Sequence, residues 1–159
     1  LHLIGCAQRE LKKYDEAVES FFEARRLFKK NKEVIHVARC DQKIASCLIE
    51  LGEGEKALER ARKAVDVFET AHDHRRETFA LFEYGKAQIL LEQYEEGLST
   101  LDQVLMVATE DEPKDFEFLV DIETRMAKVM RLQNREAEAV EIERRLKSVT
   151  EAMEEEKED

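Results

Sequence analysis

The sequence has a single proline, five glycines and no tryptophan in 159 residues. Proline interrupts helices and glycine weakens them, so their scarcity favours helix throughout the chain. No apolar run approaches the roughly 18 residues that a membrane-spanning helix needs, and no signal peptide is visible. The three cysteines are an odd set without paired spacing, which argues against a disulfide framework and predicts a reducing, cytoplasmic location.

Charge is abundant but mostly of one sign. Charged residues make up 40% of the chain and the net charge is −11, which argues against binding to a nucleic-acid backbone. Part of this charge lies at the C-terminus, where residues 151–159 include six acids and one lysine. We expect this tail to be a fraying helix end or a disordered run.

An internal repeat is the strongest signal in the sequence. Small residues recur at steps of 40, 40 and 42, at Gly5, Ala45, Gly85 and Ala127. A second set follows the same steps, at Ala17, Ala57, Gly97 and Ala139, and leucines mark the ends of three helices at Leu11, Leu51 and Leu91. This self-similarity predicts four helical hairpins.

The apolar spacing predicts eight helices and no strands. Their expected ranges are 1–12, 15–29, 33–51, 55–70, 76–91, 94–108, 113–132 and 135 into the acidic tail. Asp15 is the expected N-cap of the second helix, and Gly52 and Gly54 are expected to end the third. Pro113 suits the first turn of the seventh helix, and residues 72–75 are expected to be a polar linker.

The repeated residues resemble the tetratricopeptide repeat (TPR), in a long-period variety of about 40 residues where the common period is about 34. The first hairpin matches that family best, at Ile4, Gly5, Leu11, Tyr14, Ala17, Phe21 and Ala24. The second and third match with alanine or leucine in place of the aromatic residue. The fourth is divergent, because Glu143 stands where the aromatic residue belongs.

This resemblance implies an all-α, right-handed superhelical solenoid of four antiparallel hairpins, at residues 1–30, 33–71, 75–109 and 113–150. A single repeat domain would cover residues 1–150, followed by the acidic tail. The resemblance also implies a concave groove, lined by the first helix of each hairpin, that binds a peptide or protein segment. The predicted function is therefore a protein-interaction scaffold. The alternative is a ligand- or peptide-sensing domain of a larger bacterial regulator, since long-period arrays resemble those of peptide-sensing regulators and cell-polarity adaptors.

Catalytic and metal chemistry find little support in the sequence. We find no glycine-rich phosphate loop and no arrangement of serine, histidine and aspartate, so an enzyme and a cofactor are not expected. His2 with Cys6, and His36 with Cys40, have the spacing of paired metal ligands on a helix. We expect no metal, because His36 is predicted in a turn and Cys40 in packing. The lysine and asparagine clamp of the family is missing, since His2, Cys6, Gln42 and Ser46 hold its places.

The register of the first helices predicts the groove residues. These are His2, Cys6 and Arg9, then Arg39, Gln42, Ser46 and Ile49, then Phe79, Phe82, Lys86 and Ile89, and finally Thr124, Lys128 and Arg131. Apolar residues on the fifth helix, ringed by positive charge, predict an amphipathic partner with apolar anchors and acidic flanks. Phe79 and Phe82 have an alternative interpretation as core residues.

The first helix begins abruptly, with Leu3 and Ile4 apolar and no capping residue before them. Terminal repeats normally need a polar outer face. We therefore expect the array to be cut at its N-terminus, and this face to be covered by upstream residues or by self-association with a second copy.

Overall fold

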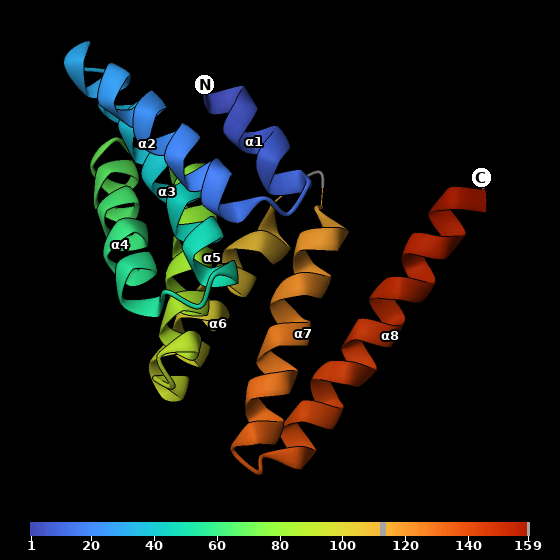
Figure 1. The fold of residues 1–159 in the computed structure, drawn as a ribbon. Coiled ribbons are helices and arrows are strands. Elements are labelled where there is room, and N and C mark those ends of the chain that lie inside the picture. The colour runs from blue at the N-terminus through green and yellow to red at the C-terminus, as the bar shows by residue number, and fades with distance from the viewer. Residues whose placement is uncertain (112–113, 159) are drawn as a thin grey trace. The chain divides into compact units, whose positions relative to one another are not determined.

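A computed structural model of the chain describes residues 1–111 and 114–158, and in them it forms eight helices and no strands (Figure 1). The predicted all-α fold is confirmed. The helices are α1 (His2–Glu10), α2 (Tyr14–Lys30), α3 (Val34–Glu50), α4 (Gly54–Thr70), α5 (His74–Leu90), α6 (Tyr94–Glu110), α7 (Phe116–Leu132) and α8 (Glu136–Glu158). Among the residues described, none of the helices combines the length and the hydropathy of a membrane-spanning segment.

Six of the turns between helices share one geometry. Each of these six has a residue with positive φ, between 54° and 76°, at Lys12, Lys32, Gly52, His72, Glu92 and Asn134. In the first turn the amide of Lys13 donates to the Gln8 carbonyl at 2.9 Å and that of Lys12 to Arg9 at 2.8 Å. This pair of bonds is the Schellman motif, and it recurs in the other five turns. Helices α2 to α6 each have 17 residues, so three-residue turns produce the 40-residue period.

The backbone of these turns also explains how the helices begin. Lys13, rather than the predicted Asp15, is the N-cap of α2, and Asp15 lies in its first turn. Lys13 forms no side-chain capping bond, because its ammonium group has no acceptor for a helix amide (φ −87°, ψ 67°). The predicted start at Pro113 lies outside the described residues. α8 continues to Glu158, so the tail is helical for most of its length.

Glycine at the left-handed turn positions should stabilise the protein. A side chain in that conformation costs roughly 1–2 kcal/mol, which glycine avoids. Lys12→Gly, Lys32→Gly and Glu92→Gly should each raise the free energy of unfolding in urea by about 1 kcal/mol. Arg62→Gly, inside α4, is the control and should lower it by about 1 kcal/mol. Equal losses in all four variants would contradict the assigned turn geometry.

The chain divides into two compact units, Leu1–Gly97 and Leu98–Asp159, with the boundary inside α6. In the first unit α3 packs against α2, α4 and α5. Its core includes Phe21, Ile44 and Cys47, all fully buried, with Ala57 and Ala87 beside them. Small residues allow close approach here, since a Cβ added to Gly5 would lie 2.8 Å from the Phe21 ring.

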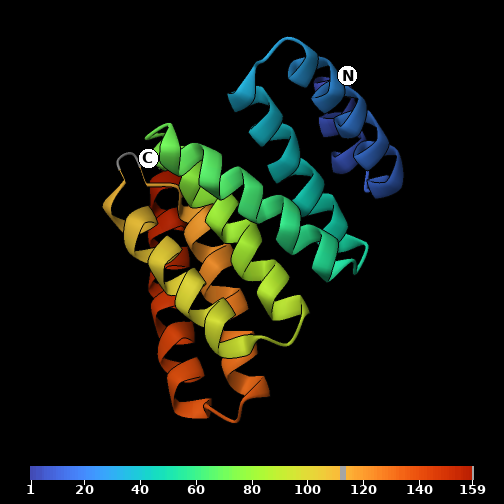
Figure 2. The same ribbon diagram turned by 90° about the vertical axis from the view of Figure 1, so that its left-hand side faces the viewer.

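The second unit includes the hairpin of α7 and α8, which pack against each other as the antiparallel orange and red pair of Figure 2. Ile122, Met126 and Ile142 are buried in this unit. Glu143, which occupies the place of the expected aromatic residue, is exposed and accepts hydrogen bonds from Arg131 at 2.8–3.1 Å. An ion pair between helices therefore replaces an apolar contact in this divergent hairpin.

The outer face of α1 is apolar and exposed. Leu3, Ile4 and Leu11 are 81%, 53% and 70% exposed, whereas Ile44, one repeat after Ile4, is fully buried. Ile44 is buried because α2 of the preceding hairpin covers α3. Self-association through the α1 face stays a prediction, which the mass of the protein in solution tests.

Candidate functional site

The half-exposed face of α3 carries three of the polar residues that the sequence analysis singled out. Its buried side faces α2 and α4 through residues such as Ile44 and Leu48. Arg39, Gln42 and Ser46 are half-buried on the other side, and Ile49 lies one turn further. Lys43 lies one helical turn from Arg39 on the same face. The sequence analysis did not include it among the groove residues.

α1 extends this face with three half-buried residues, His2, Cys6 and Arg9. The His2 ring meets the edge of Phe21 at 5.4 Å between centroids, and its Nδ1 lies 3.8 Å from the Cys6 sulfur. Burial, followed by the positive charges of Arg39 and Lys43, lowers the pKa of His2. His2 is therefore neutral at pH 7, and the α1 and α3 residues share one electrostatic environment.

Positive charge on this face is only partly compensated. Arg9 pairs with Glu10 at 2.8 Å. Arg39 and Lys43 form no ion pair with any residue that the structure describes. Burial, followed by the charge of Arg9, lowers the pKa of Lys43. We call Arg9, Arg39 and Lys43, with the adjoining Gln42 and Ser46, the basic face.

On α5, the predicted groove residues are engaged within the protein. Phe82 is 5% exposed and Lys86 is 8% exposed. The Lys86 ammonium lies 2.7 Å from a Glu83 carboxylate oxygen and 4.7 Å above the Phe82 ring. The core interpretation, kept open from the sequence, therefore describes Phe82, and the charge of Lys86 is neutralised by Glu83.

The other α5 candidates are half-buried. Ile89 faces α6, because a Cβ added to Gly97 would lie 2.7 Å from its Cγ1. Phe79 is half-buried. In the second unit, Thr124 and Lys128 are exposed, while Arg131 is bound by Glu143 and Glu136 of its own hairpin. In the first unit, Arg39 is therefore the predicted groove cation that forms no ion pair with a described residue, and it lies one helical turn from Lys43 on α3. A site centred on the fifth helix stays a prediction.

A buried charge cluster escaped the sequence analysis. Asp41 is 2% exposed and its Oδ1 accepts hydrogen bonds from Arg25 of α2 at 2.8 Å and from Arg60 of α4 at 3.0 Å. One carboxylate on α3 thus joins the second helices of two hairpins. No sequence spacing marks this cluster, because the three residues come from three helices, and a lone aspartate on a charged helix is normally solvated.

The cysteines are free thiols, as predicted. Burial raises the pKa of Cys40 and of Cys47 to about 11, so both thiols are protonated at neutral pH. Among the residues that the structure describes, no three histidine, cysteine or acidic side chains form a group that could hold a metal ion. His36 lies in α3 rather than in a turn as predicted. Its Nδ1 lies 3.3 Å from a Glu33 carboxylate oxygen, and its ring stacks on Phe28 at 4.8 Å between centroids.

No family model and no curated protein matches the sequence. Solved structures nevertheless share its fold. The crystal structure of BtubC (BKLC) from P. vanneervenii superposes with a TM-score of 0.83 at 16% identity, over 96% of this chain and 63% of that one. TPR-like repeats of a putative kinesin light chain from Podosopora anserina superpose with a TM-score of 0.73 at 16% identity, over 97% and 74%.

The fold is TPR-like. The apo form of RapI also matches, with a TM-score of 0.77 at 16% identity, over 95% of this chain and 42% of that one. The chain thus spans less than two thirds of the length of BtubC and less than half that of RapI. Identities of this size establish the TPR-like fold alone.

Proposed function

We propose that this TPR-like chain is a non-catalytic scaffold whose basic face binds an acidic, amphipathic segment of a partner protein. The observation that carries the proposal is the pair Arg39 and Lys43, which form no ion pair with any described residue of a protein with a net charge of −11. Half-buried cations without an ion-pair partner favour an anionic ligand, which restores the interactions that burial removes.

The surroundings of the two cations suit a peptide. Gln42 and Ser46 supply hydrogen-bonding groups beside them on α3, and Ile49 supplies an apolar contact one turn away. An amphipathic segment places carboxylates and apolar anchors a helical turn apart. Acidic flanks would pair with Arg39 and Lys43, and the same charges would steer the partner during association.

Charge reversal on the basic face should abolish this interaction. The probe is a fluorescein-labelled amphipathic peptide with leucines at i, i+3, i+4 and i+7 and glutamates at both ends, read by fluorescence anisotropy. Arg39→Glu with Lys43→Glu should weaken binding at least about tenfold, because each lost ion pair is replaced by repulsion. The control Arg26→Glu with Arg62→Glu makes the same charge change on exposed positions of α2 and α4 and should change the Kd less than about twofold.

The pH dependence offers a second readout of the same site. The lowered pKa of Lys43 means that its positive charge is lost at a lower pH than that of an ordinary lysine. Binding should therefore weaken on the alkaline side before exposed lysines titrate, and Lys43→Arg should remove that early loss. Equal weakening by the two double charge reversals would contradict the proposal.

A further inference from the structure

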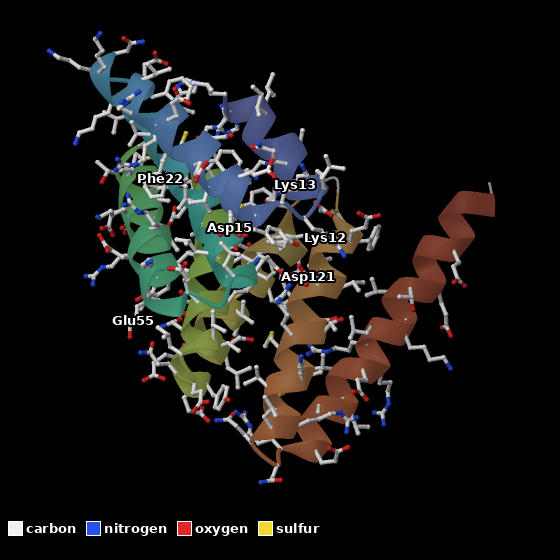
Figure 3. The ribbon with its side chains drawn as sticks, viewed as in Figure 1. Lys12, Lys13, Asp15, Phe22, Glu55 and Asp121 are labelled. Atoms are coloured by element: carbon white, nitrogen blue, oxygen red, sulfur yellow. The ribbon has the colours of Figure 1, made fainter. Side chains whose placement is uncertain are left out.

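A pocket of about 420 Å3 opens between α2 and α4 on the first unit, on residues that the basic face does not use. This volume is in the range of small ligand sites, about 300–1,000 Å3. Val18 and Phe22 of α2 form one wall, and Leu48 and Leu51 at the end of α3 form the floor. Figure 3 shows Asp15 and Phe22 on α2, and Glu55 near the start of α4.

The buried charge cluster borders the pocket through Arg60, which lines it. Arg25 and Arg60 both donate to Asp41, which ties α2 and α4 to the intervening α3. Arg60 then lies over the Phe22 ring at 4.9 Å, while 39% of Phe22 remains exposed. An aromatic wall fixed by a bound arginine is typical of sites where a few preorganised residues supply most of the binding energy.

The rim of the pocket is acidic. Glu53 and Glu59 have lysine partners, Lys56 and Lys63, and Arg60 is committed to Asp41. Asp15 and Glu19 also line the rim, and neither forms an ion pair with any described residue. Two uncompensated carboxylates thus stand beside an apolar floor.

We infer that this pocket binds an apolar side chain of a partner segment flanked by lysine or arginine. The apolar residue would cover Phe22, Val18 and Leu48, and its basic neighbours would meet Asp15 and Glu19. The charge preference is the reverse of that of the basic face, so one chain would carry two sites that select partner segments of opposite charge.

Fluorescence anisotropy with designed peptides tests this inference. The probe carries one central leucine between two pairs of arginines. Comparison peptides have a central serine, or glutamates in place of the arginines. We expect the arginine–leucine peptide to saturate the protein below about 1 mM, and either comparison peptide to bind at least about tenfold more weakly, because it loses the apolar anchor or the charge match.

Two variants on α2 locate the site, each with a matched control. Glu19→Lys should weaken the arginine–leucine peptide at least about tenfold, whereas Glu23→Lys, one turn away and outside the pocket, should have an effect below about twofold. Phe22→Ala should weaken it similarly, and Leu27→Ala, also exposed on α2, should not. Circular dichroism melts verify that all four variants are folded.

Several results would overturn the inference. Equal weakening by Glu19→Lys and Glu23→Lys would show a general attraction between opposite charges. Equal binding of the serine peptide would show that no apolar side chain is needed. Tighter binding of the glutamate peptide would show that the site prefers acidic rather than basic flanks. Because Arg39 and Lys43 do not line this pocket, the two proposals fail separately.

Discussion

Replacing Asp41 by alanine is expected to lower the free energy of unfolding by about 3–5 kcal/mol, the usual cost of removing one partner of a buried charge cluster. The substitution leaves the guanidinium groups of Arg25 and Arg60 facing each other, although each side chain is only 22% exposed. It also removes a carboxylate that bonds both α2 and α4 to α3.

Urea unfolding followed by circular dichroism measures this effect. Asp66→Ala is the matched control, because Asp66 lies on α4, is exposed and forms no ion pair with the described residues. Its effect should stay within about 0.5 kcal/mol. A loss below about 1 kcal/mol for Asp41→Ala would mean that the cluster is solvated and does not connect the three helices.

Truncating Phe21 to alanine should cost a similar amount, about 3–5 kcal/mol, the range for a buried aromatic residue. Its side chain is fully buried and packs in the core with Ile44, Cys47 and Leu48. Gly5 of α1 lies directly against the ring. The space left by the truncation therefore adjoins a residue that has no side chain to fill it.

The adjacent Phe22 provides the control for this substitution. Phe22→Ala removes the same number of atoms from the same helix, but 39% of that side chain is exposed. We expect its thermal melt to change much less than that of Phe21→Ala, because less apolar surface returns to water. Equal shifts for the two variants would contradict the register that places Phe21 in the core.

The repeat could be read from the sequence because packing and turns both follow it. Gly5, Ala45 and Gly85 recur at 40 residues and are all buried. The eight helices in the described residues follow within a few residues of their predicted bounds. The left-handed turn conformations were harder to predict, because the residues that adopt them are mostly lysine, histidine, glutamate or asparagine rather than glycine. Residue type alone therefore did not indicate a left-handed conformation at these positions.

The binding surface was less predictable than the fold. Helical register placed Arg39, Gln42 and Ser46 on one face of a helix, and all three are half-buried on α3. It could not show that Glu83 neutralises Lys86, or that Phe82 is buried, because both depend on how neighbouring helices pack. Lys43 and Asp41 could not be distinguished in sequence from other single charges on a helix for the same reason. Lys43 forms no ion pair with a described residue, whereas Asp41 accepts hydrogen bonds from two arginines.

Binding of an acidic segment to the basic face on α1 and α3 is tested most directly by a 15N chemical-shift titration with the glutamate-flanked amphipathic peptide. We expect the amide shifts to concentrate around Arg9, Arg39, Lys43 and Ser46, and to shrink as salt screens the charges. Shifts that are centred instead on the α2–α4 pocket, or that spread evenly over the chain, would contradict it.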